Sequence, residues 1–84
     1  MTNDPEIDLP PMTAPIKRSV TIDGHRTSVS LEDPFWKALA AEASKRGMTR
    51  AVLIGRIDHA RPPAVGLATA LRLFVMDAVT RREP

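Results

Sequence analysis

The dipeptide Asp23-Gly24 constrains the fold of this chain more than any other feature, because it stands between two runs of alternating character. Asp-Gly favours a two-residue type I′ turn, since both central residues of that turn need a positive φ. With Asp23-Gly24 as the loop, Ile22 faces His25 across an antiparallel pair. The sequence therefore predicts a β-hairpin over residues 18–31.

The two faces of this predicted hairpin differ in chemistry, since successive side chains of a strand point to opposite sides. One face is mostly apolar and holds Val20, Ile22, His25, Thr27, Val29 and Leu31. The other face is entirely polar and holds Ser19, Thr21, Arg26, Ser28 and Ser30. Because a one-residue slip would mix the two sets, this separation supports the register.

Three helices are predicted after the hairpin. The first follows the second strand without a loop, covers residues 34–46, and has Asp33 as its N-cap. Gly47 suits the left-handed position after its last turn. Thr49 is the predicted N-cap of a second helix over residues 50–60, in which Arg50 and Arg56 face solvent. A Pro-Pro linker leads to a C-terminal helix over about residues 65–80, so that residues 62–84 extend the domain of residues 17–61.

Three features of the sequence indicate a dimer. The chain has 84 residues and no cysteine, so it lacks disulfides and forms only a small core. The helix over residues 65–80 is apolar on most of its sides and needs a surface to cover it. Gly55, which costs about 1 kcal/mol in a helix relative to Ala, is explained if two helices approach closely across the dimer.

The charge of the chain is unevenly placed. Residues 1–16 contain Asp4, Glu6 and Asp8, no basic residue and several prolines, and are predicted to be a disordered tail. The other residues carry all 12 Lys and Arg and 7 of the 10 acidic residues, a net charge of +5. A basic folded part favours a polyanion such as nucleic acid, although ordinary solvated charge explains the same count.

Several classes of protein do not fit the sequence. Cys and Tyr are absent, and the two histidines, His25 and His59, have no matching ligand pattern. We therefore predict no catalytic residues, no metal site and no cofactor. The sequence has no signal-peptide pattern and no apolar run long enough to cross a membrane, which suits a cytoplasmic protein.

Four segments together resemble a ribbon-helix-helix protein of the Arc/MetJ type. They are RTSVSL (26–31), DPFWKAL (33–39), ASKRGMT (43–49) and AVLI (51–54). The hairpin ahead of the ribbon strand is similar to a bacterial branch of that family. The resemblance implies a mostly α fold with a short β-ribbon, in which two subunits pair their strands and bury their helices together. An extra hairpin strand and a C-terminal helix would be added to this homodimer.

The resemblance also implies a function and residue roles. The polar face of the ribbon would enter the major groove of double-stranded DNA, and the start of the second helix would hold a phosphate through backbone N–H groups. Base contacts would come from Arg26, Ser28 and Ser30. Phosphate contacts would come from Met48, Thr49, Arg50, Lys17 and Arg18. The dimer core would be built from Val29, Leu31, Phe35, Trp36, Leu39, Leu53, Ile54 and Ile57.

The extra strand conflicts with this picture and leaves two functions open. Strands lie nearly 5 Å apart, so a four-stranded sheet made by two hairpins is about 15 Å across and too wide for a groove of about 12 Å. Either residues 18–22 separate from the sheet on binding, as in a transcriptional regulator or antitoxin-like repressor, or the sheet has another use. The alternative function is a protein-interaction module, with a partner at the polar sheet face or at the C-terminal helix.

Overall fold

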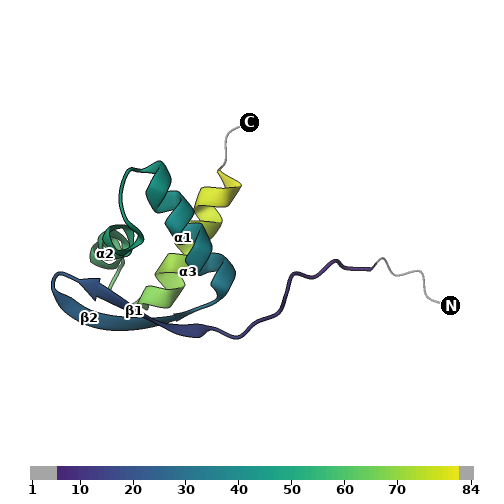
Figure 1. Ribbon diagram of the computed structural model, residues 1–84, viewed down its shortest axis with the longest axis horizontal. Coiled ribbons are helices and arrows are strands. Elements are labelled where there is room, and N and C mark those ends of the chain that lie inside the picture. The colour runs from purple at the N-terminus through teal and green to yellow at the C-terminus, as the bar shows by residue number, and fades with distance from the viewer. Residues whose placement is uncertain (1–5, 82–84) are drawn as a thin grey trace.

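The computed structural model describes residues 6–81, which form a hairpin and three helices. Strands β1 (Ile16–Ile22) and β2 (His25–Leu31) are followed by α1 (Asp33–Lys45), α2 (Arg50–Ala60) and α3 (Leu67–Thr80). All three helices lie on one side of the hairpin (Figure 1). The fold class predicted from the sequence, a β-ribbon followed by helices with an additional C-terminal helix, is confirmed for the single chain.

The hairpin has the register that the Asp-Gly turn predicts. Ile22 pairs with His25, and antiparallel pairing continues to Ile16 and Leu31. Asp23 and Gly24 have φ values of 53° and 77°, the left-handed conformation that a type I′ turn requires. The pairing is longer than predicted, because β1 begins at Ile16 and not at residue 18.

The helix ends follow the local sequence closely, but α1 begins and ends one residue earlier than predicted, and α3 begins at Leu67 and not at residue 65. The N-cap of α1 is Glu32 and not Asp33, which is the first helical residue and uses its carboxylate in ion pairs. Gly47 has a φ of 71° and ends α1 as predicted. The Thr49 hydroxyl accepts a hydrogen bond from the Val52 N–H at 3.2 Å, which makes it the N-cap of α2.

Helix α3 completes the core of the single chain. Leu71 is fully buried and Val75 is 5% exposed, against α1, α2 and β2. The expectation that this helix needs a second subunit to bury it is thus wrong for its inner face. Its outer face carries an apolar stripe that remains exposed in one chain and consists of Leu73, Met76 and Val79.

Gly55 has a different neighbour from the one expected. A Cβ atom at this position would lie 3.7 Å from Cγ2 of Ile22, at an ordinary van der Waals distance. Within one chain, therefore, Gly55 faces Ile22 of strand β1 and not another helix, and a Cβ atom would fit at this position.

The N-terminal segment lies outside the packed part of the chain. Residues 6–15 form no helix or strand and extend away from the hairpin (Figure 1). The predicted disordered tail covers residues 1–16, of which residues 1–5 lie outside the described part and Ile16 belongs to β1. No helix within residues 6–81 has the length and apolar character needed to cross a membrane.

Candidate nucleic-acid interface

The face of the hairpin that points away from the helices is polar over its whole length. Its side chains are all exposed and come alternately from both strands: Lys17, Ser19, Thr21, Arg26, Ser28 and Ser30. We call this set the outer sheet face. On the opposite side of the same strands, Val20 and Val29 are 5% exposed and Leu31 is fully buried. Since the core fixes which side chains point inward, the outer set is held on one face of the sheet.

Both cations on this face, Lys17 and Arg26, are free to meet a ligand. Within residues 6–81, Lys17, Arg26 and Arg56 make no ion pair and no side-chain hydrogen bond, and none of them lies over an aromatic ring. The other described Lys and Arg side chains are held by carboxylates or by the aromatic rings of Phe35, Trp36 and Phe74. Lys17 and Arg26 lie on the outer sheet face, and Arg56 lies on α2. A partner for the sheet would thus meet positive charge without breaking an internal contact.

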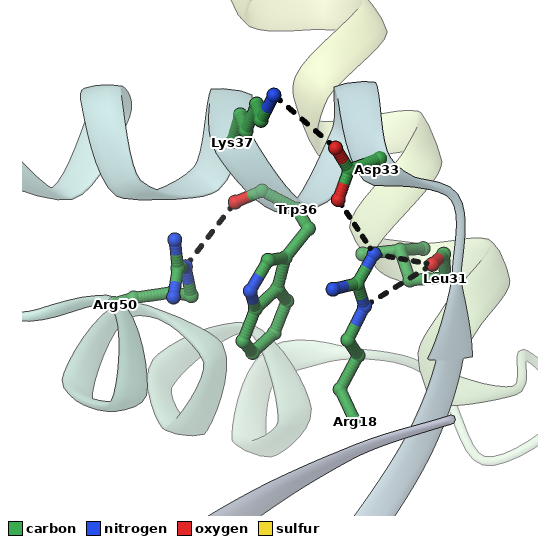
Figure 2. A network of polar contacts seen from close by, with 6 residues as sticks. All are labelled: Arg18, Leu31, Asp33, Trp36, Lys37 and Arg50. Atoms are coloured by element: carbon green, nitrogen blue, oxygen red, sulfur yellow. Dashed lines mark hydrogen bonds and ion pairs between the residues drawn. The ribbon is translucent and has the colours of Figure 1, made fainter. Parts of the chain in front are cut away.

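Arg18 occupies the helix-facing side of the sheet. Its guanidinium donates hydrogen bonds to the Leu31 carbonyl oxygen, from Nη2 at 3.2 Å and from Nε at 3.4 Å. The same Nη2 lies 3.0 Å from Oδ1 of Asp33, and the side chain is only 14% exposed (Figure 2). The hydrogen bonds with Arg18, and then with Lys37, hold the pKa of Asp33 below its usual value. This engagement favours a structural role for Arg18 over the predicted phosphate contact.

Arg50 also differs from its expected setting. It was predicted to face solvent, but its guanidinium lies over the Trp36 ring, 4.0 Å from the centroid, and its Nε donates to the Trp36 carbonyl oxygen at 3.2 Å. The guanidinium carbon of Arg18 lies 5.1 Å from the centroid of the same ring, so that Trp36 stands between two guanidinium groups (Figure 2). Burial, followed by repulsion from Arg18, lowers the pKa of Arg50.

The start of α2 faces an open groove beside β1. The groove has a volume of about 270 Å³, and its wall includes Arg50 together with two residues of the outer sheet face, Ser19 and Thr21. Met48 packs against the core, and the Thr49 hydroxyl is occupied as a cap. Of the residues predicted to contact phosphate, Lys17 therefore belongs to the outer sheet face and Arg50 lies beside it. The backbone N–H groups in the first turn of α2 are the other donors that this region offers.

The residues predicted as a dimer core serve first as the core of one chain. Val29, Leu31, Leu39, Leu53 and Ile54 are buried without a second subunit, and Phe35, Trp36 and Ile57 pack against them. Sequence reasoning assigned no site role to Ser19 and Thr21, although the alternation already placed both on the polar face. The same alternation separates Arg18 from its neighbour Lys17, because adjacent residues of a strand point to opposite faces.

Comparison with known proteins identifies the family of the domain. No curated protein and no solved structure matches the chain at a significant level. A family model described as a ribbon-helix-helix domain matches residues 15–79, which include both strands and nearly all of the three helices. Because this match covers most of the chain, the protein belongs to the ribbon-helix-helix domain family.

Proposed function

We propose that this protein binds double-stranded DNA through the outer sheet face and acts as a transcriptional regulator or antitoxin-like repressor. The observation that carries the proposal is the exposed, wholly polar face with Arg26 and Lys17 free of internal partners. Arg is the most common side chain in specific base contacts, through its two parallel hydrogen bonds to guanine. Ribbon-helix-helix proteins typically bind DNA in this regulatory role, which agrees with the face that the hairpin presents.

The test compares two free arginines of the same chain. Fluorescence anisotropy of mixed duplex DNA fragments is measured for the natural protein, Arg26→Ala and Arg56→Ala, at low and moderate salt. Both variants lose one charge, but only Arg26 lies on the outer sheet face. We expect Arg26→Ala to weaken binding by about 1–3 kcal/mol and Arg56→Ala to weaken it less. Binding should also fall steeply as salt rises, since phosphate contacts release counterions.

Two results would count against this function. Equal losses in the two variants would mean that total charge, and not the sheet, determines binding. An absence of binding at low salt, from protein shown to be folded by circular dichroism, would reject DNA binding altogether. That result would leave the protein-interaction module as the better function.

The second candidate, a protein-interaction module, is favoured by one specific observation, the apolar stripe of α3. Leu73 is 60% exposed, Met76 54% and Val79 40%, at the spacing of one helix face. Such a stripe would bind either a second copy of the chain or another protein. Ribbon-helix-helix proteins typically form homodimers, so we propose a homodimer for this chain as well. Sedimentation of the natural protein tests the homodimer. Sedimentation of Met76→Glu tests the stripe as its contact, because loss of the dimer in the variant would place the subunit contact on α3.

A further inference from the structure

We propose that the two chains of the homodimer exchange their N-terminal segments, so that residues 6–15 of each chain dock in a groove of the second copy. We call these residues the N-terminal arm. The groove lies between the end of β1 and α2, and we call it the turn-end groove. Its lining includes Ile22, Asp23, Val52, Gly55, Arg56 and His59. The inference rests on the homodimer proposed above and goes beyond it by naming a pair of surfaces that the two copies exchange.

The turn-end groove is an open cleft with apolar walls and a volume of about 250 Å³. Val52 in its wall is 45% exposed. A Cβ atom at Gly55 would lie 3.7 Å from Cγ2 of Ile22, so no close contact within one chain requires glycine at this position. Glycine nevertheless destabilises the interior of a helix relative to alanine. The glycine is explained if the space above it receives a side chain from another molecule.

The N-terminal arm carries apolar side chains that its own chain leaves uncovered. Ile7 is 77% exposed, Leu9 65% and Met12 70%, and the arm extends away from the hairpin and the helices (Figure 1). Apolar side chains that are exposed together indicate a contact surface. The three prolines of the arm restrict its backbone to extended conformations. This restriction lowers the entropy that the arm loses when it docks.

The charges of the arm and of the groove are complementary. The arm contains Glu6 and Asp8, and no Lys or Arg occurs within residues 1–16. At the groove, Arg56 makes no ion pair within residues 6–81. The acidic residue of the lining, Asp23, already has a partner, because its carboxylate lies 2.6 Å from Nε2 of His59. Docking would therefore bring the acidic arm to a cation that has no carboxylate of its own.

The second copy's groove is easier for the arm to reach than its own. In the two-stranded sheet, β2 pairs with β1 along one edge and leaves the other edge unpaired, so a second β2 can pair there antiparallel about a two-fold axis. Antiparallel pairing brings the turn of one copy to the end of the sheet where Ile16 of the other copy lies. The second copy's groove is then about 15 Å away, or three strand spacings across the sheet.

The length of the arm suits this distance. The stretch from Leu9 to Pro15 spans up to about 23–25 Å when it is extended, which is enough to cross the sheet and enter the groove. To reach the groove of its own chain, the arm would have to reverse direction at Ile16 and run back along the whole of β1. Pro15 opposes that reversal, because proline and the residue before it favour extended conformations.

The decisive test mixes two charge-reversed chains and measures by native mass spectrometry how they pair. Asp8→Lys reverses the arm and keeps the natural groove, and Arg56→Asp reverses the groove and keeps the natural arm. If the arms are exchanged, both contacts are attractive in the mixed dimer and both are repulsive in either homodimer. We expect the mixed dimer to exceed about four-fifths of all dimers, against the half that random pairing gives.

A matched control separates docking from the overall attraction between unlike charges. Lys45→Asp changes the charge of the chain as Arg56→Asp does, but Lys45 lies at the end of α1 and outside the groove lining. Mixed with Asp8→Lys, this control should pair randomly. Random pairing with Arg56→Asp, or an equal excess with Lys45→Asp, would overturn the inference. A natural protein without any dimer would reject the homodimer and the exchange together, while DNA binding would still be decided by Arg26→Ala.

A second measurement tests the apolar part of the contact. Gly55→Leu fills the groove, whereas Gly55→Ala adds only a Cβ atom at an ordinary distance from Ile22. We expect Gly55→Leu and Leu9→Ser each to raise the dissociation constant of the dimer by about fivefold or more in sedimentation, and Gly55→Ala to change it by less than about twofold. Combined, Gly55→Leu and Leu9→Ser should weaken the dimer no further than the larger single effect, because both remove the same contact. Additive losses, in variants shown to be folded by circular dichroism, would mean that Leu9 and the groove act independently and would reject the docking.

Discussion

The two faces of the β1–β2 hairpin use arginine in opposite ways. Arg18 and Arg26 belong to the same small sheet, but Arg18 points toward the helices and Arg26 points away from them. Arg18 is 14% exposed and binds a carbonyl oxygen, a carboxylate and an aromatic ring, whereas Arg26 is exposed and makes none of these contacts. The comparison shows that the position of an arginine relative to the core decides whether its guanidinium is held by internal contacts or left free of them.

The largest effect should come from truncating a buried side chain on the helix-facing side of the hairpin. Leu31 is fully buried where β2 meets α1, so Leu31→Ala should lower the free energy of unfolding by about 2–5 kcal/mol, through lost burial and the cavity left behind. The neighbouring change Ser30→Ala, on the outer sheet face, should stay within about 0.5 kcal/mol. Urea unfolding followed by circular dichroism measures both. Similar losses in the two variants would show that the faces are not separated as described.

Arg18→Met should have the next largest effect. The change keeps an unbranched side chain beside Trp36 but removes the charged hydrogen bonds to Leu31 and Asp33. We expect a loss of about 1–2 kcal/mol in the free energy of unfolding, at the low end for charged hydrogen bonds because Asp33 is 40% exposed and also pairs with Lys37. The slope of DNA affinity against salt should not change, because we expect the internally bound Arg18 to contact no phosphate. A reduced slope with unchanged stability would instead place Arg18 on a phosphate.

This contrast also shows how far the sequence alone leads. The Asp23-Gly24 turn and the alternation of apolar residues predict the register, because both are local properties of the chain. The same alternation places Arg18 on the helix-facing side. Because Arg18 is next to Lys17 and both are positively charged, a phosphate contact was nevertheless predicted for both. The contact of Arg50 with Trp36 joins the start of α2 to α1. No local pattern encodes that contact, since it depends on how the two helices pack.

The position of α3 is a second case in which packing decides. The sequence of α3 is apolar on most sides of the helix. This correctly predicts that the helix is buried but does not say which surface covers it. In the structure its inner residues Leu71 and Val75 fill the core of the same chain, and Arg72 forms an ion pair with Glu32 at the start of α1. The second subunit expected from composition is therefore not needed to cover that face.

Acid should weaken the junction between β2 and α1. The hydrogen bond from Arg72 holds the pKa of Glu32 below its ordinary value of 4.5, and Arg18 and Lys37 lower that of Asp33 from 3.8. The unfolded chain therefore binds protons at these two carboxylates more readily than the folded chain does. The stability that their ion pairs contribute is present above the ordinary pKa values and is lost as the pH falls through the lowered ones. Thermal unfolding between pH 6 and pH 3 should show this loss, and Arg72→Met should reduce the part due to Glu32. An identical pH profile in the variant would exclude that ion pair as a source.

The smallest effect should come from the turn, where the two faces of the hairpin meet. Asp23 and His59 lie 2.6 Å apart, but both side chains are 65% exposed, and exposed pairs contribute about 0–1 kcal/mol. Asp23→Asn removes the charge and keeps a residue that tolerates the left-handed φ of 53°. Global stability should change by less than about 1 kcal/mol, while hydrogen exchange of the Ile22 amide, which pairs with His25 next to the turn, should become faster. Because the core residue Val20 lies on the same strand, exchange that remains slow in the variant would show that core packing alone holds β1 down to its last residue.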